Sequence, residues 1–87
     1  MNSRATRQFW KLYDALPLEI RQRARRAYEL WLNDPRHPSI QFKKVDDQEL
    51  IYSARVTDDY RVLGVLEDDT VTWFWIGKHE EYERMLK

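Results

Sequence analysis

The stretch LIYSARVTDDYRVLGVLEDDTVTWFWIGKHEEY, residues 50–82, decides the fold. It contains three runs, residues 50–56, 60–66 and 71–76, in which β-branched and aromatic residues recur with period two. Pairs of aspartates separate the runs. This alternation is typical of β-strands, and acidic pairs between strands indicate tight turns. The stretch therefore predicts three antiparallel strands joined by two hairpins.

The turn at residues 68–69 sets the register of the second hairpin. A two-residue loop there predicts three cross-strand pairs: Leu66 with Val71, Gly64 with Trp73 and Val62 with Trp75. The same register pairs Arg61 with Ile76. Gly64 has no side chain, which leaves room for an indole opposite it.

The first hairpin admits two registers. A two-residue loop, 58–59, would place Arg55 on the apolar face of the strands, whereas a three-residue loop, Thr57–Asp59, places it opposite Arg61 on the other face. A slip of one residue moves every side chain of a strand to the other face. The three-residue loop keeps one face apolar, and it is the register that we expect.

These registers predict one apolar face that helices must cover: Tyr52, Ala54, Val56, Tyr60, Val62, Leu66, Val71, Trp73 and Trp75. The other face carries Ser53, Arg55, Arg61, Thr72, Phe74 and Ile76. Two opposed arginines repel each other, so either an anion binds between them or acids such as Glu49 or Glu80 pair with them. Phe74 and Ile76 beside two cations would suit an amphipathic acidic segment of a partner protein.

Two amphipathic helices are expected before this stretch. Thr6 is the expected N-cap of a helix over residues 7–16, and Pro17 ends that helix and begins the next one. The run at residues 33–35, Asn-Asp-Pro, stops the second helix. Four arginines of this helix form either a solvated face or a surface for RNA phosphate or an acidic partner: Arg21, Arg23, Arg25 and Arg26.

The remaining segments complete a single α+β domain over residues 1–87. Residues 1–5 are a frayed end or a short edge strand, and residues 41–45 form a first short strand. Residues 79–86 form a last helix that packs back through Tyr82, Met85 and Leu86. The predicted architecture is a helical hairpin packed on a twisted antiparallel sheet of three to four strands.

The amino-acid composition limits the compartment, the membrane association and the nucleic-acid binding that can be expected of the chain. The 87 residues include no Cys, which suits a reducing cytoplasm, and no apolar run is long enough to span a membrane. The net charge is zero: residues 1–45 carry ten Lys/Arg against four Asp/Glu, and residues 46–87 carry five against eleven. A neutral chain argues against strong non-specific binding of nucleic acid. The first half still allows a local basic surface.

Few sets of residues in the chain could catalyse a reaction or bind a cofactor. There is no phosphate-binding glycine loop, and the two histidines, His37 and His79, lack metal-ligand spacing, so neither a metal nor a cofactor is expected. What remains is a basic set with a neighbouring tyrosine: Lys43, Lys44, Arg55, Arg61, Lys78, His79 and Tyr82. Arginines bind phosphate and stabilise charge in the transition state, and a histidine exchanges protons near neutral pH. The set fits metal-free phosphodiester chemistry, although a lone histidine near a terminus is more often a surface residue.

The order and spacing of several motifs resemble the RelE/ParE superfamily of bacterial type II toxins. The motifs are F..LYDALP, NDPRHPSI, KKVDDQELIYSARVTDDYRVLGV and WFWIGKHEEYERML. The resemblance implies a cognate antitoxin that wraps the toxin with an extended segment and helices. It also implies a metal-independent endoribonuclease, an mRNA interferase that cuts mRNA on the ribosome through attack of the RNA 2′-hydroxyl and so inhibits translation.

The resemblance also implies roles for individual residues. Arg61 resembles the phosphate-binding arginine of the family, Arg55 a second one, and His79 its acid/base residue. Tyr82 resembles the C-terminal aromatic, and Lys43 and Lys44 are similar to the basic residues before the second hairpin. The neutral charge and the faint N-terminal strand depart from the family pattern. Two other functions stay open: a ParE-like toxin that binds DNA gyrase, and a non-catalytic interaction module.

Overall fold

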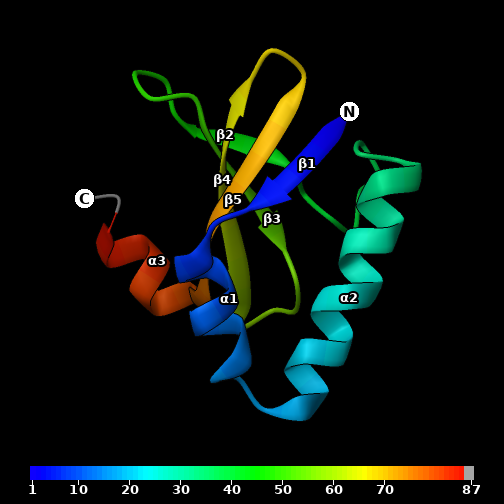
Figure 1. Cartoon of the computed structure of the whole chain (residues 1–87), viewed down its shortest axis with the longest axis vertical. Coiled ribbons are helices and arrows are strands. Elements are labelled where there is room, and N and C mark those ends of the chain that lie inside the picture. Colours follow the sequence, from blue (N-terminus) through cyan, green and yellow to red (C-terminus); the bar gives the residue numbers. More distant parts are fainter. Residues whose placement is uncertain (86–87) are drawn as a thin grey trace.

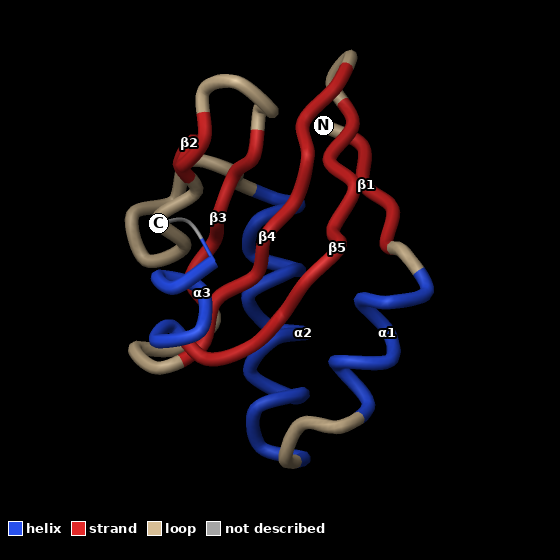
Figure 2. The backbone as a smooth tube through the Cα atoms, turned by 90° about the vertical axis from the view of Figure 1, so that its left-hand side faces the viewer, coloured by secondary structure: helices blue, strands red, loops and turns tan. Residues whose placement is uncertain are grey.

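The computed structural model describes residues 1–85, in which one five-stranded sheet separates two helices from a third. The strands are β1 (Asn2–Ala5), β2 (Lys43–Asp46), β3 (Ile51–Arg55), β4 (Tyr60–Glu67) and β5 (Thr70–Lys78). The helices are α1 (Arg7–Asp14), α2 (Leu18–Asn33) and α3 (His79–Met85). Both α1 and α2 lie on one face of the sheet, and α3 lies on the other (Figures 1 and 2). No helix within residues 1–85 combines the length and the apolar character needed to cross a bilayer.

The predicted α+β class is confirmed, but the sheet has one more strand than expected and is mixed. Its strand order is β1-β5-β4-β3-β2, and β1 runs parallel to β5. The amide of Asn2 donates to the carbonyl of Asp69 at 2.9 Å, and the amide of Thr6 donates to the carbonyl of Trp73 at 2.9 Å. Of the two predicted alternatives, a frayed end or a short edge strand, the structure shows the edge strand. Its partial exposure explains why its sequence carries no strong apolar alternation.

The helices begin where their capping residues indicate. The side chain of Thr6 accepts a hydrogen bond from the amide of Phe9 at 3.1 Å, which confirms it as the N-cap of α1. Helix α1 ends at Asp14, two residues earlier than predicted, and α2 follows directly after Pro17.

The last helix packs back through fewer side chains than predicted. Tyr82 is buried as expected, but Met85 is half exposed and does not join the core. Leu86, which was also expected to pack back, lies outside the described residues.

Both hairpin loops have the predicted lengths. Arg55 is opposite Arg61, and the amide of Val56 donates to the carbonyl of Tyr60 at 3.0 Å, so residues 57–59 form the three-residue loop of the first hairpin. The loop between β4 and β5 has two residues, Asp68 and Asp69, with φ angles of 48° and 66°. Two central residues with positive φ form the hairpin turn whose twist matches that of its strands. The pairs Leu66–Val71 and Gly64–Trp73 follow from it, as predicted.

Beyond Gly64 the predicted register of the second hairpin is wrong, because Phe74 is an extra residue in β5. Trp75 is opposite Leu63 rather than Val62, and Ile76 is opposite Val62. A bulge of this kind inverts the alternation of the strand that follows it. Trp75 and Ile76 therefore exchange faces relative to the prediction. Ile76, at 2% exposure, is not part of the expected partner surface beside Phe74.

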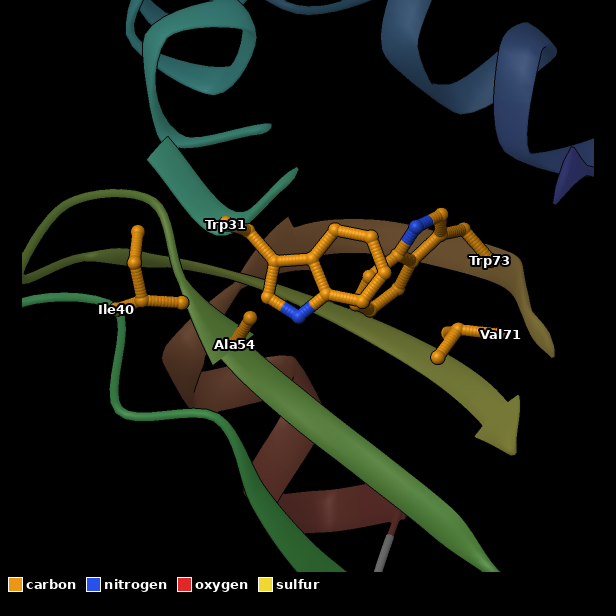
Figure 3. Packing of buried hydrophobic residues seen from close by; sticks show 5 residues of the cluster. All are labelled: Trp31, Ile40, Ala54, Val71 and Trp73. Carbon is orange, nitrogen blue, oxygen red and sulfur yellow. The ribbon is translucent and has the colours of Figure 1, made fainter. Parts of the chain in front are cut away.

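Three buried clusters show why the inverted alternation is favourable. Under the helical hairpin lie two of them: Trp31, Ile40, Ala54, Val71 and Trp73 (Figure 3), and Tyr13, Val56 and Ile76. The third cluster lies between the sheet and α3: Leu63, Trp75 and Tyr82. Because β5 places Trp73 on one face and Trp75 on the other, each side of the sheet buries a large indole.

We expect Gly64→Ala to destabilise the protein by about 2 kcal/mol, the range typical of overpacking. A Cβ at residue 64 would lie 2.6 Å from Cγ1 of Val71 and 2.7 Å from Cε3 of Trp73. Urea denaturation of the purified protein measures the change. In a double-mutant cycle with Val71→Ala, the double variant should lose less stability than the sum of the single variants. Strict additivity would contradict the contact.

Candidate functional site

The candidate site lies where the β3–β4 loop meets the start of α3. The amide of His79 donates to the carbonyl of Asp59 at 2.7 Å, which holds the first turn of α3 against this loop. Arg61 pairs with Gly77 in the sheet, rather than with Ile76 as predicted. Since Gly77 is two residues before His79, the sheet brings Arg55, Arg61 and His79 to the same end.

Arg61 is held by the backbone of its own loop. Its Nη1 donates to the carbonyls of Thr57, of Asp58 at 3.3 Å and of Tyr60 at 3.0 Å. Partial burial lowers the pKa of the Arg61 guanidinium, and the nearby charge of Arg55 lowers it further. The guanidinium stays charged because arginine titrates far above neutral pH. The loop therefore presents a fixed, partly desolvated cation.

Arg55 is paired with an acid of the same loop. Its Nη2 lies 2.7 Å from a carboxylate oxygen of Asp58. This hydrogen bond and the charge of Arg55 lower the pKa of the Asp58 carboxyl. Asp58 therefore supplies the counter-charge that was expected from Glu49 or Glu80, neither of which pairs with either arginine within residues 1–85. The side chain of Asp58 is 91% exposed, so its contact with Arg55 is open to competition from solvent or a ligand.

His79 is oriented by two residues of its own helix. Its ring stacks on Tyr82, with centroids 5.4 Å apart and an interplanar angle of 22°. Its Nε2 lies 3.4 Å from a carboxylate oxygen of Glu83. Sequence reasoning missed Glu83, although a spacing of four residues on a helix places two side chains together. His79 keeps a partly exposed edge, whereas Tyr82 is buried at 8% exposure.

Trp75 packs beside α3 and covers Gly77, the residue that pairs with Arg61. Its indole covers Gly77 so closely that a Cβ there would lie 2.6 Å from Cζ2 of the ring. Trp75 also packs with Leu63 and Tyr82. The sequence prediction placed Trp75 on the opposite face of the sheet, and only the bulge at Phe74 brings it here.

The three lysines differ in position. Lys43 pairs with Ser53, which is two residues before Arg55 on the same face of β3. Lys44 pairs with Tyr52 on the opposite face, and its Nζ lies 3.7 Å from Asp47. Lys78 is exposed at the end of β5, next to His79. By register, Lys43 lies on the same face as the arginines, whereas Lys44 and Lys78 lie on the opposite face, since Lys78 pairs with Tyr60 of the cluster under the helical hairpin. Lys78 is adjacent to His79 in the chain.

The assembled side chains define what the site can do chemically. Two arginines can bind one phosphate, and a histidine beside them can transfer a proton. Within residues 1–85, no three His, Asp or Glu side chains gather in a way that could hold a metal ion. The groups present are those of acid–base chemistry at a phosphodiester.

Solved structures with this fold come from bacteria and archaea. The RelB–RelE antitoxin–toxin complex of Methanococcus jannaschii contains a chain that superposes with a TM-score of 0.73 at 18% identity, covering 95% of this chain and 98% of that one. YafQ of E. coli strain BL21(DE3) gives 0.73 at 14% identity, covering 93% and 96%. The YoeB/ParE toxin of Agrobacterium tumefaciens gives 0.71 at 12% identity, covering 91% and 99%.

The match in sequence is at the level of the family. No curated protein matches the chain as a relative. The family of the ParE-like toxin domain matches residues 18–84, which includes both hairpins, most of α3 and every residue of the candidate site. The chain therefore belongs to the family of ParE-like toxin domains.

Proposed function

We propose that this chain is the toxin of a type II toxin–antitoxin system and an endoribonuclease that cleaves mRNA without a metal ion. The observation that carries the proposal is the convergence of Arg55, Arg61 and His79 at one end of the sheet. Two cations and an adjacent imidazole are the groups that phosphodiester cleavage by a 2′-hydroxyl requires.

In the proposed reaction, Arg61 and Arg55 bind the scissile phosphate of the RNA. The 2′-hydroxyl loses its proton to solvent water as the 2′-oxygen forms a bond to phosphorus, and the bond from phosphorus to the 5′-oxygen breaks. His79, in its protonated form, donates a proton to the leaving 5′-oxygen. Arginines placed where charge develops stabilise the transition state. Arg55 exchanges the carboxylate of Asp58 for phosphate oxygens when RNA binds.

Four further residues have supporting roles in this proposal. Tyr82 is buried and stacks on His79, so it positions the imidazole and does not stack a base. Glu83 holds the other side of the ring. Lys43, on the face of the arginines, and Lys78, exposed and directly before His79 in the chain, bind neighbouring phosphates of the RNA. Lys44 has no place in this set, because it lies on the opposite face of β2.

The proposed partners are mRNA, the ribosome and an antitoxin. The chain is neutral overall, and a neutral surface binds free RNA weakly. We propose that cleavage takes place on translated mRNA, where the ribosome presents the substrate, because the resemblance to RelE-like toxins implies it. Chains with the same fold are known in complex with RelB antitoxins, which supports a protein antitoxin for this chain too.

The family match favours one alternative, a ParE-like toxin that acts by binding DNA gyrase. Such a toxin has no need of a general acid. The response to loss of His79 therefore separates the two functions.

We expect His79→Ala to lower mRNA cleavage by about 10²–10⁴-fold, the contribution typical of a general acid. Arg61→Ala should lower it similarly, since a phosphate ligand is lost. Primer extension on mRNA from induced cells, and on the same mRNA with and without translation in an extract, measures cleavage. His37→Ala is the matched control, because His37 lies in the α2–β2 connection and should leave cleavage unchanged.

Growth arrest that His79→Ala retains, with no cleavage by either protein, would instead support gyrase binding. A supercoiling assay with purified gyrase then tests that alternative directly.

We expect Asp58→Asn to strengthen phosphate binding several-fold at neutral pH, because Arg55 loses its charged competitor. Calorimetric titration with a non-cleavable 2′-deoxy oligonucleotide measures the affinity. In the parent protein the pKa of Asp58 is lowered, so its competition persists at neutral pH and disappears only as the pH falls through that lowered pKa. Asp59→Asn is the control, since it removes the same charge from the same loop without breaking the Arg55 pair. Equal effects of the two variants would rule out a specific competition by Asp58.

A further inference from the structure

The four arginines of α2 divide into two pairs on different sides of the helix. Arg21 and Arg25 are one turn apart on the side of α1, where Nε of Arg25 donates to the hydroxyl of Tyr13 at 2.8 Å and Arg21 is half-buried. Arg23 and Arg26 are also one turn apart, but they lie on another side of α2 and are exposed. The first pair therefore helps to pack the helical hairpin, whereas the second pair, called here the α2 pair, does not.

The α2 pair borders an open hollow of about 180 Å³ between α2 and the end of β3. Arg55 is a third cation in the lining of this hollow. The other lining residues within residues 1–85 are uncharged, so no acid offsets the three arginines there. A concave surface lined by charges of one sign concentrates ions of the opposite sign. The hollow is therefore suited to an anion.

The α2 pair is available to a ligand, whereas Arg55 already has partners. Nη2 of Arg55 lies 2.7 Å from a carboxylate oxygen of Asp58, and its Nη1 lies 3.5 Å from the carbonyl oxygen of Ser39. Neither Arg23 nor Arg26 forms an ion pair within residues 1–85. Their guanidinium groups keep their N–H donors for an anion that reaches the hollow.

The α2 pair is also close to the candidate site. The hydrogen bond and the charge of Arg55 lower the pKa of the Asp58 carboxyl, and the charges of Arg61 and Arg23 lower it further. Because such an effect weakens with distance, Arg23 lies near the loop that carries Asp58. Arg55 in turn lines the hollow and is opposite Arg61 in the sheet. The cations thus form one row from Arg61 through Arg55 to the α2 pair.

We propose that Arg23 and Arg26 bind phosphates of the RNA beyond the scissile phosphate, so that one strand extends from Arg61 past Arg55 onto α2. This inference rests on the proposed function, because it extends the substrate site of the same nuclease. A nucleic acid carries a negative charge at every nucleotide, so a row of cations that begins at a phosphate ligand matches its backbone. Contacts of this kind position the strand and do not read its sequence.

Two 2′-deoxy oligonucleotides, which cannot be cleaved, test the α2 pair by their length. A dinucleotide has one phosphate and reaches only Arg61 and Arg55, whereas a hexanucleotide also reaches α2. We expect the double variant Arg23→Gln with Arg26→Gln to bind the hexanucleotide about tenfold more weakly at low salt. Its plot of log affinity against log salt should be less steep by about 1.4, since each phosphate contact on a single strand contributes about 0.7. Calorimetric titration should show unchanged dinucleotide binding.

The double variant Arg4→Gln with Arg7→Gln is the matched control. It removes the same charge from two exposed arginines at β1 and the start of α1, and β1 is at the edge of the sheet away from β3. This control should bind both oligonucleotides as the parent protein does. Equal weakening of the hexanucleotide by the two double variants would show non-specific attraction and overturn the inference. Urea denaturation of both variants confirms that the fold is kept.

A hexaglutamate peptide separates RNA from an acidic protein segment. If the peptide binds the parent protein as tightly as the hexanucleotide does, and loses as much affinity in Arg23→Gln with Arg26→Gln, the α2 pair belongs to a protein partner and the inference is wrong. Hexanucleotide binding that does not depend on the α2 pair also overturns it, even where His79→Ala abolishes mRNA cleavage. Conversely, a parent protein that cleaves no mRNA but needs the α2 pair for the hexanucleotide would refute the nuclease and keep the phosphate site.

Discussion

The bulge at Phe74 is the constraint on which the rest of the structure depends. With one extra residue in β5, Trp73 faces the helical hairpin and Trp75 faces α3. A regular strand would place both indoles under the hairpin and leave Phe74 as the aromatic residue of this part of β5 on the α3 side. A bulge also increases the local twist and bends its strand. The same local irregularity therefore supplies the core on both sides of an 87-residue chain.

The bulge also determines what the site contains. After it, Gly77 is opposite Arg61, and the Trp75 indole fills the space that a side chain at residue 77 would need. The strand then passes directly into α3, whose first residue is His79. The proposed acid–base residue, His79, and the proposed phosphate ligand, Arg61, are thus brought together by a rigid sheet register, which is more precise than a loop can be.

Much of the fold follows from local signals in the sequence. The lengths of both hairpin loops, the cap at Thr6 and the stop before Pro17 are properties of a few adjacent residues. The opposition of Arg55 and Arg61 was predictable because one register alone kept a face apolar. The family resemblance drew attention to His79 and Arg61, which adjoin the same loop.

Other features depend on tertiary contacts that period-two patterns cannot reveal. The run VTWFWI is apolar on both faces, so its alternation gives no sign of an extra residue at Phe74. The parallel pairing of β1 depends on an edge that only the folded sheet provides. The pairing of Arg55 with Asp58 was not predicted, because Asp58 lies in the hairpin loop and not on a neighbouring strand. The three-residue loop itself returns this carboxylate to the arginine.

The loop Thr57–Asp59 explains how two opposed arginines coexist without a ligand. Its backbone carbonyls satisfy Arg61, and its exposed acid neutralises Arg55. The carbonyl contacts of Arg61 and the carboxylate contact of Arg55 differ in how easily a ligand can replace them. Carbonyls of a structured loop stay in place, whereas an exposed carboxylate exchanges readily with solvent. A phosphate would therefore add to the bonds of Arg61 but displace Asp58 from Arg55, so the loop leaves one cation fixed and the other ready to change partners.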